Sequence, residues 1–268
     1  MPHLTTLSVI LPVLDERDNL AELVPVIVTI LGATLPEFEV IVVDDSSTDG
    51  TDHLMQELTT ADNRVRYHVR SGKGRSLPAS LSDGVAMARF PHVAWMDADG
   101  SMPVNALVLL VDSYRNSPEH ELIVVGSRFV RGGGFKGVNE VGNTRWWTVV
   151  KNLRESNDSL AAVILSRMLN RYLWILLDRC CRDLASGFIL ASREVVNQVG
   201  IRGSYGDYCI RFLYGAHRLG YQLCEVPYIC LVRRHGVSKT GITLAQLLKR
   251  GLPYLTTPLR VRREFASR

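Results

Sequence analysis

Short apolar runs alternate with longer amphipathic segments along the first half of the chain. The runs are rich in β-branched residues, which favours strands, and the segments between them carry apolar side chains at helical spacing. The expected strands cover residues 7–14, 38–45, 65–70, 92–97 and 121–128. This alternation predicts an α/β fold: a single domain with a Rossmann-like, mainly parallel sheet flanked by helices on both faces.

Charged or turn-forming residues occur where most of these strands end. Open parallel sheets bind ligands beyond the carboxyl ends of their strands, so these residues are the first candidates for a site. They are Asp15 and Glu16, Asp44 and Asp45, Asp97 and Asp99, and Ser127 and Arg128.

The segment VVDDSSTDGT, residues 42–51, joins a strand to a helix that is expected to begin at Thr51. A carboxylate at this position can accept hydrogen bonds from a base or a ribose hydroxyl, but it can equally cap the helix. The chain has no GxGxxG or Walker A sequence, which argues against dinucleotide-binding and P-loop folds. A nucleotide bound here therefore needs another means of neutralising its phosphates.

The segment DADGS, residues 97–101, provides a means of neutralising phosphates. Asp97, Asp99 and Ser101 alternate along the chain, so their side chains share a face if the segment is extended. Hard oxygen ligands suit Mg²⁺ or Mn²⁺, and such a metal would stabilise a diphosphate leaving group as a Lewis acid. The competing interpretation is a cap for a helix starting near Pro103, which accounts for Asp99 or Ser101 but not for Asp97. We favour the metal site.

Composition and charge narrow the class of protein, its partners and its cellular compartment. Of the 268 residues, 46% are hydrophobic and 22% charged, as in globular proteins. The net charge is +4, and the cations between Arg128 and Arg268 form either a solvated face or a surface for phosphate or anionic membrane. The five cysteines show no CxxC spacing and fit a reducing cytoplasmic compartment. The basic residues lack interleaved aromatic side chains, so we expect no nucleic-acid partner.

Seven motifs occur in order along residues 7–240: LPVLDERDNL, VVDDSSTDGT, WMDADGSMP, GSRFVRGGG, RDLASGF, EVP and RRHGVSK. In this arrangement the chain resembles the family 2 inverting glycosyltransferases with a GT-A fold. Within them it is most similar to polyprenyl-phosphate sugar transferases of the dolichol-phosphate mannose synthase type. We expect a transferase domain over residues 1–240, with a nucleotide-sugar half (1–126) and an acceptor half (127–240), and a basic amphipathic tail over 241–268.

The resemblance implies a nucleotide-sugar donor, GDP-mannose first and UDP-glucose next, with Mg²⁺ or Mn²⁺ as cofactor. Asp97 and Asp99 would flank the donor diphosphate and its metal. Ser101 stands where the family usually has a glutamine that helps to hold the metal, and a shorter hydroxyl can leave that position to water. The implied nucleotide contacts are Pro12, Asp15, Glu16, and either Asp44 or Asp45.

The implied acceptor is a polyprenyl phosphate. A phosphate monoester is already an oxygen anion at neutral pH, so it needs cations that hold it in line rather than a general base. The candidates are Arg128, Arg233 and Lys239, assisted by Arg131, Arg234 and Ser238.

One part of the family's acceptor motif is altered. The phosphate-binding serine of the family corresponds to Ser166, but the arginine expected four residues earlier is Ala162. A long insertion that precedes this segment could supply the missing cation. Its candidates are Arg145, Lys151 and Arg154.

Two alternatives stay open. Relatives that glycosylate hydroxyl groups use an acidic general base ahead of a helix, where Asp207 stands, although Asp207 can also be that helix's N-cap. The changes at Ser101 and Ala162 also fit a nucleotide-sugar-binding protein that has lost catalysis. Metal-dependent hydrolysis of the donor would separate an enzyme from a pure binder.

Residues 160–182 form an apolar segment interrupted by a polar helical stripe. Its uninterrupted apolar stretches are shorter than the roughly 20 residues that a membrane span needs. The segment predicts either an interfacial membrane helix or an amphipathic core helix. We expect a cytoplasmic protein that is peripheral to the membrane and has no transmembrane span.

Overall fold

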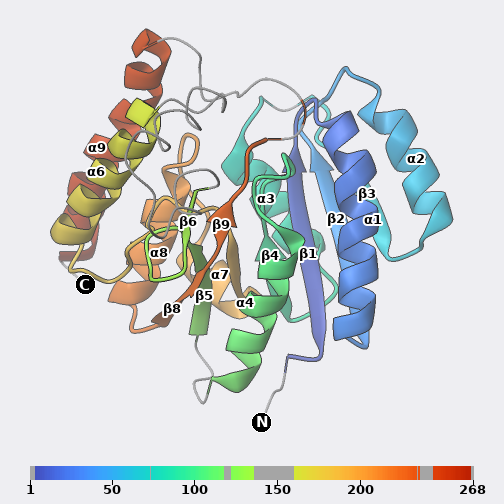
Figure 1. The fold of residues 1–268 in the computed structure, drawn as a ribbon, viewed down its shortest axis with the longest axis horizontal. Helices are drawn as coiled ribbons and strands as arrows, with labels where there is room; N and C mark the ends of the chain where they lie inside the picture. Colours follow the sequence, from blue (N-terminus) through green and yellow to red (C-terminus); the bar gives the residue numbers. More distant parts are fainter. Residues whose placement is uncertain are drawn as a thin grey trace, which may run out of the picture.

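The computed structural model describes residues 4–72, 74–117, 122–135, 160–233, 235 and 244–266. Strands and helices alternate through the first half, as the sequence pattern predicts (Figure 1). The strands are β1 (Thr6–Val13), β2 (Glu37–Asp44), β3 (Val65–Val69), β4 (His92–Trp95), β5 (Leu122–Ser127), β6 (Gly134–Phe135), β7 (Ile189–Ser192), β8 (Gln222–Pro227) and β9 (Ile229–Cys230). The helices are α1 (Arg17–Thr34), α2 (Thr51–Ala61), α3 (Leu77–Met87), α4 (Val104–Asn116), α6 (Leu160–Leu176), α7 (Arg193–Val199), α8 (Tyr208–Arg218) and α9 (Leu244–Ala266).

Seven strands form one sheet in the order β3-β2-β1-β4-β7-β5-β8. The neighbouring pairs among β1 to β4 are parallel, and so are β5 and β8. Strand β7 runs antiparallel between β4 and β5 and so joins the two halves of the sequence in one sheet. A separate parallel pair, β6 and β9, completes the described strands. The carboxyl ends of β1, β2 and β4 therefore lie at one edge, where the candidate residues occur.

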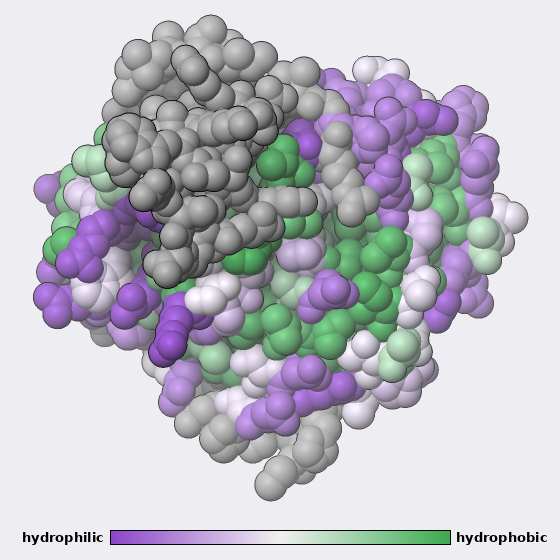
Figure 2. Space-filling model, viewed as in Figure 1, coloured by the Kyte–Doolittle hydropathy of each residue, from purple (hydrophilic) through white to green (hydrophobic). Residues whose placement is uncertain are grey.

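Helices cover both faces of the sheet, and each strand contributes to both layers because its side chains alternate. On β1, Val9 and Leu11 pack toward α1 and α4, whereas Ile10 packs toward α3. Figure 1 shows α1 and α4 on the near face. In Figure 2 apolar surface gathers where these two helices meet, over a groove of about 280 Å³ whose lining includes Leu23 and Val104.

The C-terminal helix is part of this domain. Val261 of α9 is fully buried in the core layer that also holds Phe212 and Leu213 of α8. At Gly215 of α8, a Cβ atom would come within 3.0 Å of the Phe265 ring. The described part of the expected basic amphipathic tail over residues 241–268 is helix α9, which is packed against α8.

Helix α6 is amphipathic in an unusual way, because apolar side chains lie both in the core and at the surface. Leu173 is fully buried, but Leu165, Met168 and Ile175 are 49%, 65% and 57% exposed. The helix lies beside α9 at one end of the molecule (Figure 1). Within the described parts of the chain, none of the helices has the length and apolar character required to cross a membrane.

Candidate active site

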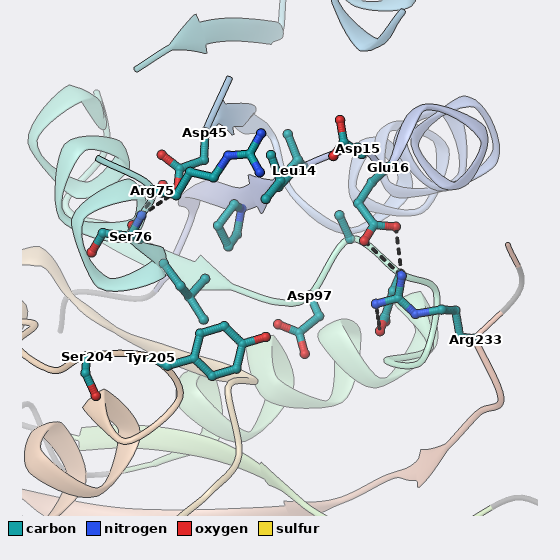
Figure 3. A pocket seen from close by; sticks show the side chains of 16 residues that line it. Leu14, Asp15, Glu16, Asp45, Arg75, Ser76, Asp97, Ser204, Tyr205 and Arg233 are labelled. Atoms are coloured by element: carbon teal, nitrogen blue, oxygen red, sulfur yellow. Dashed lines mark hydrogen bonds and ion pairs between the residues drawn. The ribbon is translucent and has the colours of Figure 1, made fainter. Parts of the chain in front are cut away.

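A pocket of about 540 Å³ opens at the carboxyl edge of the sheet (Figure 3). It is built from the segments that follow β1, β2 and β4, from the start of α3, and from the loop before α8. The predicted site residues that line it are Pro12, Asp15, Glu16, Asp45, Asp97, Asp99 and Arg233. Strand ends thus bring together carboxylates that are far apart in the sequence, and they meet a cation from the C-terminal motif RRHGVSK.

Asp45 lies in the pocket wall and is fixed from behind. Its carboxylate accepts hydrogen bonds from the buried Arg70 guanidinium and from the backbone N–H of Ser76. Arg70 in turn donates to Asp83 at 2.9 Å. Because a charged network holds the side chain in one position, Asp45 can present a preorganised acceptor to a ligand.

Asp44 points elsewhere. Its carboxylate accepts hydrogen bonds from Ser47 N at 2.8 Å, Ser47 Oγ at 2.7 Å and the Tyr67 hydroxyl at 2.6 Å. Burial and the bond to Asp44 raise the pKa of Tyr67. The N-cap of α2 is Gly50, which has no side chain to cap the helix, and the preceding Asp49 accepts from Thr51 N at 3.1 Å. Of the two adjacent aspartates, Asp45 faces the pocket, Asp44 shapes the turn, and neither caps α2.

Asp15 has a positive φ of 51° at the turn between β1 and α1. Its backbone N–H donates to Ser47 Oγ at 2.8 Å, and its carboxylate accepts from Thr48 N at 2.8 Å. These reciprocal bonds tie the β1 turn to the β2 turn. This end of the pocket is therefore a braced pair of loops.

The other end of the pocket concentrates negative charge around one arginine. Arg233 Nη1 lies 2.9 Å from Glu16 Oε1, and its Nη2 lies 3.1 Å from Asp99 Oδ2. Asp97 is adjacent, and burial together with the Asp99 charge raises the pKa of Asp97 against the opposing charges of Arg128 and Arg233. Figure 3 shows Asp97 directed into the cavity and Arg233 bonded to Glu16 at its rim.

Ser101 is not among the residues that line this pocket. Its N–H donates to Asp99 Oδ1 at 2.9 Å, and its carbonyl accepts from Leu231 N at 2.8 Å. The helix α4 begins at Val104 without a side-chain cap on Pro103, so the capping interpretation of the DADGS segment is wrong. The segment instead turns the two aspartates toward the pocket.

Arg128 at the end of β5 is held by Asp183, from the RDLASGF motif. The two side chains form paired bonds of 2.8 Å, and Arg128 N also donates to Asp183 at 3.0 Å. Burial opposes the charge of Arg128, but Asp183 outweighs it and raises the pKa of Arg128. The positive charge of Arg128 opposes the rise in the pKa of Asp97, although Arg128 does not line the pocket.

Asp207 and Ser166 also lie outside the pocket lining. Asp207 stands at the N-cap position of α8 but makes no capping bond to the helix, because its carboxylate binds the preceding loop. Burial would raise the pKa of Asp207, but hydrogen bonds from Tyr205, Ser204 and Thr257 hold it below its ordinary value. A carboxylate that already accepts several hydrogen bonds is a poor general base.

Six other predicted site residues lie outside the described residues. They are Ser238, Lys239, Arg234, Arg145, Lys151 and Arg154.

Comparison with known proteins decides the family, since residues 8–200 match Glycosyl transferase family 2. The chain is a family 2 glycosyltransferase. It is 31% identical over 239 residues to a polyprenol monophosphomannose synthase of Mycolicibacterium smegmatis, covering 86% of this chain and 79% of that one. It is 29% identical over 246 residues to a dolichol-phosphate mannosyltransferase of Pyrococcus furiosus, covering 90% of this chain but only 61% of that protein.

The fold of the glycosyltransferase is confirmed by solved structures. It is similar to glucosyl-3-phosphoglycerate synthase from Mycobacterium tuberculosis in complex with Mn²⁺, UDP and phosphoglyceric acid, with a TM-score of 0.66 at 19% identity. The match covers 96% of this chain and 78% of that one. A complex of that synthase with Mg²⁺ and UDP gives a TM-score of 0.64. The predicted single-domain GT-A architecture with a mainly parallel sheet is therefore correct.

Sequence reasoning missed several residues of the glycosyltransferase pocket. Arg75 and Ser76 follow β3, and the same strand-end argument that selected Asp45 applies to the turn SGKGRS in which they stand. Tyr205 carries no comparable signal, since it stands in a loop before α8 that reaches the pocket through the tertiary fold alone. The remaining missed lining residues are Val13, Leu14, Leu77, Ser80, Ala98 and Ser204.

Proposed function

We propose that this glycosyltransferase moves mannose from GDP-mannose to a polyprenyl phosphate with inversion, with UDP-glucose as the next donor. The observation that carries the proposal is the charge pattern of the pocket, where Asp97 and Asp99 adjoin Arg233. Such a site suits a metal-bound diphosphate beside an anionic acceptor. The similarity to a polyprenol monophosphomannose synthase supports this acceptor class.

The side chains fit a divalent metal. Within the described residues no cluster of three or more His, Cys, Asp or Glu residues is arranged to hold a metal ion. Two carboxylates plus substrate phosphates and water form a usual Mg²⁺ environment, so Asp97 and Asp99 suffice as protein ligands. When bound, the metal would supply Lewis-acid stabilisation of the diphosphate leaving group.

The protein's own groups divide the remaining work. Asp45 and the backbone around it hold the nucleoside, and Arg75 at the same end of the pocket adds a positive charge for the donor. Arg233 holds the acceptor phosphate in line with the anomeric carbon. Its positive charge offsets the repulsion between this phosphate and the donor diphosphate. The acceptor oxygen attacks that carbon as the bond to the diphosphate breaks. No side chain needs to remove a proton, which agrees with the saturated carboxylate of Asp207.

The proposed setting is the cytoplasmic membrane surface. On α6, Leu165, Met168 and Ile175 are exposed, and on the neighbouring α9 so are Leu255 and Leu259, at 48% and 50%. Arginines border this apolar surface, with Arg171 and Arg179 stacked on Trp174 at 4.6 and 5.1 Å. Apolar side chains with flanking cations are typical of interfacial helices on anionic lipid.

Vesicle flotation tests this membrane surface. We expect a double change, Met168→Asp with Ile175→Asp, to abolish binding to vesicles that contain anionic lipid. Leu109→Asp is the matched control, because Leu109 is 48% exposed on α4, away from α6 and α9. Equal binding by both variants would contradict the assignment.

A transfer assay tests the function itself. Radiolabelled GDP-mannose and UDP-glucose are each offered with a short polyprenyl phosphate and Mn²⁺ or Mg²⁺. We expect lipid-extractable label from GDP-mannose that disappears in Asp99→Asn. Free nucleoside diphosphate without lipid product would indicate another acceptor. Nucleotide-sugar binding without any release would identify a protein that has lost catalysis.

A further inference from the structure

The loop 203–207 separates two hollows of the molecule. On one side Ser204 and Tyr205 line the candidate active-site pocket. On the other side Ser204 and Asp207 line a second hollow of about 460 Å³, together with Thr256 and Thr257 of α9. The C-terminal helix therefore reaches the back of a loop whose front forms part of the active site.

Hydrogen bonds join the loop to this helix. Asp207 Oδ1 accepts from Ser204 N at 2.9 Å and from Tyr205 N at 2.8 Å, so the carboxylate fixes the backbone that carries Tyr205. The other oxygen, Oδ2, accepts from Thr257 Oγ1 of α9 at 3.2 Å. Asp207 and Thr257 are only 4% and 5% exposed, so water competes little for these bonds.

Close packing reinforces the hydrogen bonds. A Cβ atom at Gly206 would overlap the Tyr254 hydroxyl of α9, and one at Gly203 would lie 2.8 Å from Tyr208 N. Both glycines are therefore required by contacts on either side of Tyr205. The conformation of the loop depends on α9 at the Tyr254 and Thr257 positions.

Tyr205 lines the pocket beside the region that the proposed donor site leaves for the sugar. Asp45, Asp97 and Asp99 all line the pocket, and in the proposed donor site Asp45 marks the nucleoside end and the other two mark the diphosphate end. Figure 3 shows the Tyr205 side chain across the cavity from Asp45 and directed toward Asp97. A hexose attached to the diphosphate comes next along the pocket, opposite an aromatic ring with a polar tip that suits a sugar's apolar face and hydroxyl groups.

We propose that Tyr205 contacts the hexose of the donor and that α9 positions it through Thr257 and Asp207. This inference rests on the proposed donor site and extends it, since a helix of the proposed membrane surface then supports sugar recognition. It assigns Tyr205 to substrate binding and Asp207 and Thr257 to positioning.

The test compares two ligands on each variant by calorimetry with Mn²⁺ present. For Tyr205→Ala we expect GDP-mannose to bind about tenfold more weakly, as for the loss of one to two net contacts, with GDP binding nearly unchanged. A loop that had merely collapsed would weaken both ligands alike. UDP-glucose and UDP provide the same comparison for the second donor.

The positioning role of Thr257 is tested with a matched pair of variants on α9. We expect Thr257→Val to weaken GDP-mannose binding about threefold and Thr256→Val to leave it unchanged, because Thr257 donates to Asp207 whereas Thr256 donates to the carbonyl of Pro253. Adding Thr257→Val to Tyr205→Ala should have no further effect if Thr257 acts through Tyr205. Additive losses would overturn the coupling, and equal GDP-mannose affinity in Tyr205→Ala and wild type would overturn the sugar contact. A wild-type protein that binds neither nucleotide sugar would instead refute the proposed function and this inference with it.

Discussion

Arg233 donates a hydrogen bond to Asp99 across 3.1 Å, so a cation already faces the carboxylate that the proposed metal requires. The same guanidinium contacts Glu16 at 2.9 and 3.2 Å. Two cations cannot share Asp99 without mutual repulsion, which is strong at short range in a partly buried site. Metal binding and the position of Arg233 are therefore expected to be linked.

The first prediction concerns that linkage. Arg233→Met should raise the affinity of the substrate-free protein for Mn²⁺ by about three- to tenfold, because it removes a competing charge. The same change should strongly reduce transfer to the acceptor. Titration of free Mn²⁺ by electron paramagnetic resonance measures the affinity without turnover. Arg89→Met is the control, since Arg89 is exposed and does not line the pocket. Unchanged or weaker Mn²⁺ binding in Arg233→Met would contradict the linkage.

The second prediction concerns the buried pair of Arg128 and Asp183, in which the aspartate is fully buried. Asp183→Asn should lower the free energy of unfolding by about 3 kcal/mol, because it leaves a poorly compensated guanidinium. Urea denaturation measures the change. The matched control is Asp62→Asn at the more exposed pair with Arg64, where less than about 1 kcal/mol is expected. Equal losses at the two pairs would show that burial does not govern the effect.

Much of the fold follows from local pattern. The strands β1 to β5 are apolar runs whose alternate residues enter different core layers, and that period is visible in the sequence. Strand β7 escaped prediction because Ile189–Ser192 is short and lies directly before a helix. Its antiparallel position between β4 and β5 is decided by the tertiary fold rather than by its own residues.

The candidate site also contains residues that local pattern identifies and residues that only the tertiary fold brings to the pocket. Strand ends identified Asp45 and Asp97 because parallel strands share an edge. They could not choose between Asp44 and Asp45, since the choice depends on partners such as Tyr67 and Arg70 on β3 and just beyond it. Tyr205 was missed because its approach to the pocket depends on α9, whose contact with the loop has no sequence signature.

The third prediction compares two helical glycines. A Cβ atom at Gly84 of α3 would lie 2.5 Å from Ile10 and 3.2 Å from Val43, both in the packed sheet. Gly84→Ala should therefore cost about 1–3 kcal/mol of stability. At Gly32 of α1 the nearest atom is the flexible end of Arg64 at 3.5 Å, so Gly32→Ala should be neutral or stabilising by up to about 1 kcal/mol. Thermal unfolding separates the two, and a loss at both positions would contradict the packing argument.

The last prediction concerns a buried carboxylate remote from the pocket lining. Glu39 is 1% exposed and accepts hydrogen bonds of 2.7 Å from Ser8, Arg66 and the backbone N–H of Arg89. Burial raises its pKa, but these bonds together lower it below the ordinary value of 4.5. A carboxylate with a lowered pKa stabilises the fold above its unfolded pKa, and this stabilisation is lost as the pH falls through the folded pKa.

Glu39→Gln should therefore lower the free energy of unfolding by about 2 kcal/mol at neutral pH. The gap to wild type should narrow as the pH falls below the ordinary value of 4.5, because protonation of Glu39 then removes the same charge from the wild type. Urea midpoints across this range measure both effects, with the exposed Glu37→Gln on the same strand as control. A gap that widened toward acid pH would mean that folding raises the pKa of Glu39. The effect of burial on this pKa would then exceed the opposing effect of the contacts with Arg66 and Arg89.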